Sequence, residues 1–109
     1  MAAVLPQSEK QFQGALLELA QRLGWRAAHF NDSRRQIRPG VFVGDSDAAG
    51  WPDLVLCRPP RLLVVELKTD TGRVQPAQVE WLQALTLCNV QAFVWRPKDW
   101  DEIERTLAR

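Results

Sequence analysis

Apolar residues near the N-terminus recur every three or four positions, at Phe12, Leu16, Leu19, Ala20 and Leu23. This period is typical of one face of a helix. Ser8 and Gln11 form a capping box before the run, and Gly24 follows its last residue. The pattern predicts a helix from about Glu9 to Leu23.

The middle of the chain has the composition of strands. Residues 25–30 form a short candidate strand, followed by a polar, glycine-containing stretch over 31–50 that we expect to be a long loop. Residues 53–57 and 61–68 are rich in Val and Leu and flank the turn Pro59-Pro60. They are predicted to be two antiparallel strands of a hairpin, with the second strand more buried.

The last third of the chain returns to helical spacing. Pro76 suits the first turn of a helix that ends near Leu87, and residues 91–95 form another strand. Asp99 and Glu102 form a capping box for a final helix. The predicted order is αβββαβα, an α/β fold with a central mixed sheet flanked by helices. One face of the second helix carries Gln78, Trp81, Leu82 and Leu85.

Length and composition narrow the class of protein. A chain of 109 residues with 46% hydrophobic and 25% charged residues is predicted to form a single domain over 1–109. Its apolar runs are too short to cross a bilayer, and residues 1–6 lack the features of a signal sequence, so we expect a cytoplasmic protein. Cys57 and Cys88 are spaced for neither a zinc knuckle nor a disulfide framework and are expected to be core thiols.

Charge is distributed unevenly along the chain. Fourteen Lys and Arg against thirteen Asp and Glu leave a net charge of +1, which does not indicate a nucleic-acid partner. From Arg22 to Arg73, however, the chain has nine basic residues and only six acidic ones, so its middle is locally basic. Arg34, Arg35 and Arg38 in the long stretch, together with Arg73, are candidate phosphate contacts or a solvated basic loop.

Three charged residues occur where the predicted hairpin should be apolar. Glu66 and Lys68 lie two residues apart and therefore on one face of a strand otherwise made of Leu and Val. Asp53 begins the neighbouring strand and can lie beside Glu66. Two convergent carboxylates repel unless a cation lies between them, and oxygen ligands favour Mg²⁺ or Mn²⁺ over zinc. The alternative is a strand end that emerges into solvent and an Asp that merely follows a Pro turn.

These residues belong to a longer set that resembles a known family. The set comprises Ser8-Glu9 with Phe12-Gln13, Gly50-Trp51-Pro52-Asp53-Leu54, Glu66-Leu67-Lys68, Gly72-Arg73, Gln78 with Trp81-Leu82, and Val94-Trp95-Arg96-Pro97 with Asp99-Trp100. It resembles the PD-(D/E)xK nuclease superfamily and, more narrowly, the VRR-NUC domain, the virus-type replication and repair nuclease module. The resemblance covers nearly the whole chain and implies a restriction-endonuclease-like core.

The resemblance implies a role for each matching residue. Asp53 and Glu66 would hold Mg²⁺ or Mn²⁺ with the backbone carbonyl of Leu67, and Lys68 would orient or activate the attacking water. Gln78, an amide on an apolar helix face, would hydrogen-bond a ligand carboxylate, a metal-bound water or the substrate; otherwise it is a frayed helix-start residue. The implied activity is DNA phosphodiester hydrolysis by a metal-dependent endonuclease.

Glu9 is the further carboxylate that the resemblance adds, as a ligand or catalytic group from the first helix. A helical wheel places Glu9 beside the apolar stripe, near Leu16 and Ala20, and Glu18 on the opposite side. Glu9 can therefore face inward, while Glu18 should face water. The alternative is that Glu9 only complements the positive end of the helix dipole.

Two aromatic side chains are weaker candidates for DNA contact. His29 is the only histidine, which excludes a multi-histidine metal cluster, and its DNA contact is a minor hypothesis. Trp51 lies in a loop beside Asp53, where it can stack on an unpaired base. Family members often have a smaller or different residue there.

The resemblance also implies partners and origin. It suggests a homodimer that acts on branched DNA such as Holliday junctions, encoded by a phage or prophage and acting in DNA repair. The rival interpretation is a catalytically silent DNA-binding or accessory module of a replication or repair complex. All three of Asp53, Glu66 and Lys68 are present, which favours an enzyme.

Overall fold

A computed structural model describes residues 8–30, 35–38, 41–43 and 49–109 of the chain. Its elements follow in the order α1 (Glu9–Arg22), β1 (Arg26–His29), β2 (Arg35–Arg38), β3 (Val41–Val43), β4 (Leu54–Arg58), β5 (Arg61–Leu67), α2 (Pro76–Leu87), β6 (Gln91–Trp95), the 3₁₀ turn η2 (Pro97–Asp99) and α3 (Trp100–Ala108). The predicted α/β class is confirmed.

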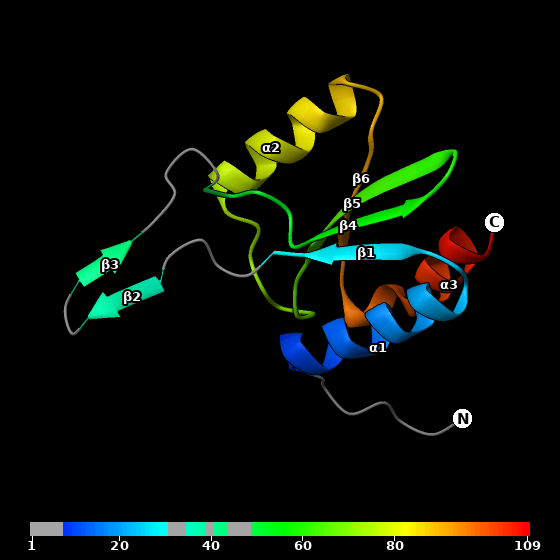
Figure 1. Ribbon diagram of the computed structural model, residues 1–109, viewed down its shortest axis with the longest axis horizontal. Coiled ribbons are helices and arrows are strands. Elements are labelled where there is room, and N and C mark those ends of the chain that lie inside the picture. The colour runs from blue at the N-terminus through cyan, green and yellow to red at the C-terminus, as the bar shows by residue number, and fades with distance from the viewer. Residues whose placement is uncertain (1–7, 31–34, 39–40, 44–48) are drawn as a thin grey trace.

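The centre of the molecule is a four-stranded mixed sheet in the order β1-β4-β5-β6. The pairs β1–β4 and β4–β5 are antiparallel, whereas β5 and β6 are parallel. A parallel pair needs a crossover, and α2 supplies it between β5 and β6 (Figure 1). The predicted hairpin therefore forms the middle of the sheet, and β5 lies between two neighbours.

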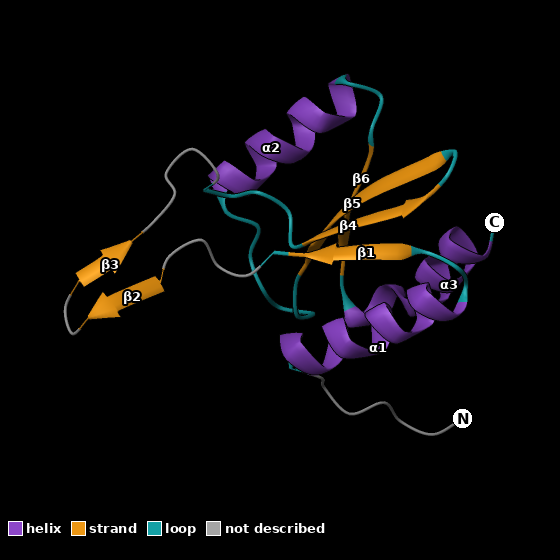
Figure 2. Ribbon diagram, viewed as in Figure 1, coloured by secondary structure: helices purple, strands orange, loops and turns teal. Residues whose placement is uncertain are grey.

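Helices cover the two faces of this sheet unequally. Figure 2 shows α1 and α3 together on one side of the sheet and α2 on the other. Side chains from α1 and α3 form one apolar core with the alternate residues of the strands. This core contains Phe12, Leu16, Ala20, Trp25, Leu54, Leu56, Leu63, Val65, Leu67, Trp95, Ile103 and Leu107.

The predicted start of α1 is confirmed in detail. The Ser8 hydroxyl accepts a hydrogen bond from the Gln11 N–H (3.1 Å), and the Gln11 side chain accepts one from the Ser8 N–H (3.0 Å). Gly24, at φ +87°, then lets the chain turn toward β1. The capping box fixes the first helical residue as Glu9, which matters for the site below.

Three expectations were wrong. The stretch over 31–50 is not a continuous loop, because β2 and β3 pair with each other as a separate two-stranded sheet. Asp99 is the N-cap residue of α3 but forms no capping box with Glu102: its carboxylate accepts from the Arg96 N–H (2.9 Å) in the turn η2 that precedes the helix. Cys88 is exposed at the end of α2 and is no core thiol, and Cys57 is only half-buried.

Among the described residues, no helix is long and apolar enough to span a membrane.

Candidate active site

Polar side chains converge at one end of the central sheet, where β4 begins and β5 ends. Leu54 pairs with Val65 in the antiparallel ladder, so one further step along both strands sets Asp53 opposite Glu66. The first turn of α2 and the start of α1 bring additional groups to this end. The register explains why two carboxylates 13 positions apart in sequence become neighbours.

Asp53 is fixed by the backbone of the neighbouring strand. Its Oδ2 accepts a hydrogen bond from the N–H of Leu67 at 2.8 Å. The side chain is half-buried, so a charged carboxylate at this position has one internal donor and partial access to water. The bond orients Asp53 toward the end of β5, where Glu66, Leu67 and Lys68 follow one another.

Glu66 is the most buried charged side chain of the site, with 2% of its surface exposed. Its Oε2 accepts from the Gln78 amide at 2.8 Å and lies 3.4 Å from the Lys68 ammonium. Its Oε1 is buried and has no hydrogen-bond partner among the described residues. Burial raises the pKa of Glu66 to about 8, and the negative charge of Asp53 adds to this rise, while Lys68 opposes it.

Lys68 shares its strand face with Glu66, as the two-residue spacing predicts. The turn that follows it is held by the Arg96 guanidinium, which donates to the carbonyls of Thr69 (2.6 Å) and Gly72 (2.7 Å). Arg96 lies within the Val94–Pro97 motif, but no role for its side chain was predicted from the sequence. Because Arg96 fixes the turn after Lys68, it restrains the direction in which the lysine leaves the strand.

Gln78 connects the first turn of α2 to the carboxylates. Its Oε1 accepts from the Gln75 N–H at 2.8 Å, so its Nε2 is left to donate to Glu66. One amide thus caps the helix with its acceptor and orients the buried carboxylate with its donor. The side chain is half-buried and ordered by both contacts, which argues against a frayed helix-start residue.

Glu9, at the first position of α1, lies within the electrostatic reach of the site. Partial burial raises the pKa of Glu9, the charge of Asp53 raises it further, and Lys68 lowers it. Glu18 instead pairs with Arg22 at 2.6 Å on the exposed side of the helix. Both glutamates are exposed, and the charges of the site affect the pKa of Glu9.

Three of the candidate DNA contacts have side chains within the described part of the chain. His29 is exposed on the edge strand β1, and Arg73 is exposed between β5 and α2. Trp51 is half-buried two residues before Asp53. Arg34 lies outside the described residues, and Arg35 and Arg38 belong to β2, whose side chains also lie outside the description. Phe30, exposed beside this site, was not singled out by the sequence.

The donor set fits a divalent cation with oxygen ligands. Two adjacent carboxylates, one with an unpartnered buried oxygen, supply the negative charge that a hard cation such as Mg²⁺ or Mn²⁺ prefers. In the described part of the chain, no three His, Cys, Asp or Glu side chains gather closely enough to form a metal cluster. Glu9 thus does not join Asp53 and Glu66 as a third ready-made ligand, and its direct ligation stays a prediction.

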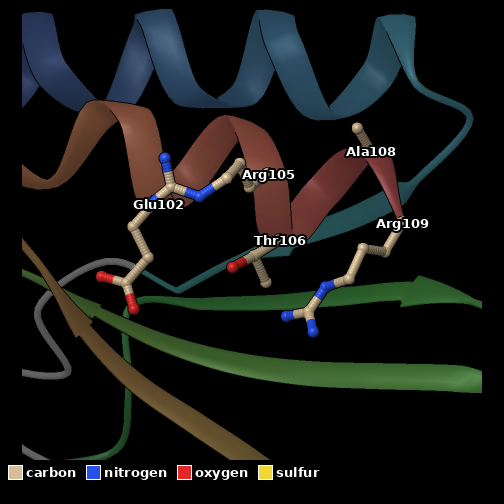
Figure 3. Close-up of a pocket in the computed structure, with 5 residues that line it drawn as sticks. All are labelled: Glu102, Arg105, Thr106, Ala108 and Arg109. Atoms are coloured by element: carbon tan, nitrogen blue, oxygen red, sulfur yellow. The ribbon is translucent and has the colours of Figure 1, made fainter.

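Two cavities in the described residues lie away from the carboxylates. One of about 660 Å³ lies along the last two turns of α3, where Figure 3 shows the Glu102 carboxylate and the Arg109 guanidinium on the same side of the helix. The other, of about 600 Å³, lies between α2 and β6 and is mainly apolar.

Comparison with known proteins agrees with this geometry. A family model described as the VRR-NUC domain matches residues 20–99. A solved VRR_NUC domain protein is similar in structure, with a TM-score of 0.59, 20% identity, and coverage of 95% of this chain and 88% of that chain. Hjc of Archaeoglobus fulgidus, described as a Holliday junction resolvase from an archaeal hyperthermophile, has a TM-score of 0.50 at 19% identity, over 80% of this chain and 67% of that chain. No curated protein matches in sequence.

Both structural likenesses have identities below 25% and therefore show the fold alone, which is the PD-(D/E)xK nuclease fold. The family match carries more, because it includes β4, β5, α2 and β6, and with them Asp53, Glu66, Lys68 and Gln78. It also spans well over half of the chain. The chain belongs to the VRR-NUC family of nucleases.

Proposed function

We propose that this protein hydrolyses DNA phosphodiester bonds with the help of Mg²⁺ or Mn²⁺ held at Asp53 and Glu66. The observation that carries the proposal is the buried Oε1 of Glu66, which has no partner among the described residues although Asp53 adjoins it. An unpaired buried carboxylate oxygen is costly, and a bound cation compensates it. The backbone carbonyl of Leu67 is the third protein ligand in this proposal.

The remaining residues prepare the site for attack on phosphorus. A divalent cation at the carboxylates would supply Lewis acidity toward a phosphate oxygen. Lys68 orients the attacking water and offsets the negative charge that develops on the phosphorane. Gln78 holds the Glu66 carboxylate in its orientation through the 2.8 Å amide contact. Glu9 adds a further carboxylate at the mouth of the site.

The substrate in this proposal is branched DNA, such as a Holliday junction. Support comes from the fold shared with Hjc, which is itself described as a Holliday junction resolvase. DNA is bound in this proposal by Arg34, Arg35, Arg38, Arg73, His29 and Trp51. The exposed Arg73 and the three arginines of the 31–50 stretch would neutralise phosphates and orient the duplex.

A homodimer is part of the same proposal, and α2 supports it. None of the twelve residues of α2, all of them described, is buried, and Glu80 is their only charged side chain. Leu87 is 85% exposed and is itself part of the lining of the 600 Å³ groove, whose described lining has no charged residue. A protruding leucine next to an apolar groove is self-complementary, as a two-fold interface requires. Leu87→Glu should therefore give monomers by sedimentation velocity, whereas Leu62→Glu should not.

The decisive experiment for the activity compares metals and substrates. Labelled Holliday junction, flap and plain duplex DNA are incubated with the protein and Mg²⁺, Mn²⁺ or EDTA, beside Lys68→Ala. We expect metal-dependent cleavage, fastest on the junction, that Lys68→Ala lacks. Equal rates on junction and duplex would remove the junction preference from the proposal. Intact DNA binding without cleavage under either metal would favour the accessory-module interpretation instead.

Metal binding has an independent readout in thermal stability. Saturating Mg²⁺ should raise the melting temperature, because a ligand at a hundred times its Kd stabilises the native state by about 2.7 kcal/mol. Asp53→Asn should abolish this shift while leaving the metal-free melting temperature nearly unchanged.

The predicted domain extent of 1–109, the cytoplasmic location, the phage or prophage origin and the repair role stay predictions.

A further inference from the structure

An aromatic side chain lies in the same cross-strand row as the two carboxylates. The Phe30 N–H donates to the carbonyl of Asp53 at 2.8 Å, which continues the β1–β4 ladder by one residue beyond His29 and Leu54. Phe30, Asp53 and Glu66 are therefore successive members of one row across β1, β4 and β5. Residues directly opposite in antiparallel strands have side chains on the same face.

Phe30 rests on a second aromatic ring that is held firmly. It meets Trp51 edge to face, with centroids 6.2 Å apart and an interplanar angle of 79°. Trp51 in turn meets Trp81 of α2 at 4.9 Å and 81°. The three rings form a chain from the open end of the sheet to α2.

The loop that carries Trp51 is anchored to α2 at two points. Trp81 Nε1 donates to the carbonyl of Ala49 at 3.0 Å. Gly50 has φ +84°, and a Cβ there would come within 2.5 Å of the Ala77 backbone, so the loop fits against the helix only with glycine. This anchoring fixes the orientation of Trp51 and, through it, the ring on which Phe30 leans.

Phe30 is nevertheless 43% exposed, and burial in the core does not explain its position. Neighbouring strands are about 4.8 Å apart. The backbone of Phe30 therefore lies roughly 5 Å from that of Asp53 and roughly 10 Å from that of Glu66. An exposed, supported ring in the same row as the two carboxylates has the position and chemistry of a stacking platform for a nucleobase.

We propose that Phe30 stacks on an unpaired or unstacked base next to the scissile phosphate, so that the site selects DNA with an interrupted base stack. The proposal rests on the nuclease function above and specifies its substrate class. In a continuous duplex each base is already stacked on its neighbours and is not available to the ring. At a flap or branch point the terminal base has a free face, which Phe30 covers.

Binding without cleavage provides the first test. A flap DNA with 2-aminopurine at the branch-adjacent position is titrated with protein in EDTA, and fluorescence and affinity are measured. We expect wild type to change the fluorescence, Phe30→Ala to lose the change and bind roughly tenfold more weakly, and Phe30→Trp to retain both. Leu62→Ala is the matched control, because Leu62 is 44% exposed at the other end of β5 and should behave as wild type.

Substrate chemistry provides the second test. Removing the branch-adjacent base as an abasic site should weaken wild type by a similar factor and leave Phe30→Ala unaffected. An equal loss for Phe30→Ala on intact duplex and flap would overturn the proposal, as would an unchanged affinity. A shift of Phe30→Ala to monomers by sedimentation, with DNA binding intact, would show that the ring contacts a second copy instead.

The two proposals fail in different ways. If no variant cleaves DNA under any metal, the nuclease proposal fails, and the fluorescence titration still reports on stacking. If wild type cleaves and Phe30→Ala keeps the same ratio of flap to duplex cleavage, the stacking proposal alone is wrong. Thermal melting of Phe30→Ala checks that the exposed substitution leaves the fold intact.

Discussion

The two ends of the central sheet differ in how fully their charged side chains are compensated. At the hairpin end, Arg58 donates to the carbonyls of Leu23 and Leu107, both at 3.0 Å, and Arg61 donates to that of Thr106 at 2.9 Å. Both guanidinium groups lie over the buried Trp25 ring, at 4.5 and 5.0 Å from its centroid. These donors therefore meet the free carbonyls at the ends of α1 and α3, which need such partners.

At the other end, charge is brought together without full compensation. Glu66 is buried beside Asp53, and one of its oxygens has no partner among the described residues. Its pKa is raised to about 8 by burial and by its neighbour. The contacts at the hairpin end therefore stabilise the fold, whereas the carboxylate end leaves a charge that the proposed cation would compensate. Unfavourable electrostatics of this kind concentrate at functional sites.

The largest expected effect separates the two ends by activity. Glu66→Gln keeps the shape of the side chain and its bond to Gln78 but removes the charge proposed to hold the cation. We expect DNA cleavage to fall about a thousandfold, a loss in the range seen when transition-state charge stabilisation is removed. Above about pH 8, where Glu66 is ionised in the metal-free protein, the variant should be more stable than wild type by about 1 kcal/mol, because a poorly compensated buried charge disappears.

Two measurements check this prediction: single-turnover cleavage with Mg²⁺ and urea unfolding in EDTA. Arg61→Lys at the opposite end is a suitable control and should cleave at the wild-type rate. A Glu66→Gln protein that cleaves normally would place the metal-binding group elsewhere.

The next effect is on stability at the hairpin end. Arg58→Ala removes two donors to helix-terminal carbonyls and a cation–π contact with Trp25. We expect the free energy of unfolding to fall by about 3 kcal/mol, since hydrogen bonds from charged groups contribute about 1.5–3 kcal/mol and the ring contact adds to this. Urea unfolding measures the loss. Cleavage per folded molecule should not change; a specific loss of activity would mean that the two ends are coupled.

The sequence predicts the carboxylate end better than it predicts the groups that support it. The site residues Asp53, Glu66 and Lys68 could be predicted from the sequence, because strand periodicity and hairpin pairing place them together. Arg96 was not, because its partners are the carbonyls of a turn 24 and 27 residues away, and no periodic pattern records such a contact. An apolar residue at a strand end, such as Phe30, is indistinguishable from a core residue until its exposure is known.

The secondary structure, too, was predicted well where the sequence has a periodic pattern and poorly where it has none. Long periodic segments such as α1 and β5 were predicted closely, because each presents a whole apolar face. The strands β2 and β3 were missed, since three or four residues are too few to establish a period. The start of α3 at Trp100 was predicted correctly, but its capping box was not, because the Asp99 carboxylate bonds to the Arg96 N–H in the 3₁₀ turn η2.

A pH titration sharpens the comparison further. The pKa of Glu66 is raised from 4.5 to about 8 in the folded state, so between these values the native protein binds more protons than the unfolded chain. The contribution of Glu66 to the stability of the metal-free protein should therefore be greatest below about pH 4.5 and should decrease as the pH rises toward 8. One such group contributes a slope of at most about 1.4 kcal/mol per pH unit.

Urea unfolding in EDTA between pH 5 and pH 8 measures that slope. Glu66→Gln should flatten most of it, and the raised pKa of Glu9 accounts for a smaller part with the same sign. Arg58→Ala should lower the whole curve and leave its slope unchanged. A wild-type slope that survives Glu66→Gln would show that other groups dominate the titration.

The smallest effect decides between two roles for Glu9. If its carboxylate only complements the α1 dipole, Glu9→Gln costs about 0.3–1 kcal/mol of stability and leaves cleavage unchanged. Because Asp53 and Lys68 both act on its pKa, we expect the opposite: cleavage about fivefold slower, with stability nearly unchanged since relief of repulsion from Asp53 offsets the lost dipole interaction. Glu18→Gln, which breaks only the exposed pair with Arg22, is the matched control and should alter neither quantity measurably. Parallel kinetics and urea unfolding of the two variants distinguish a site carboxylate from a helix-capping charge, because only a site carboxylate slows cleavage without a matching loss of stability.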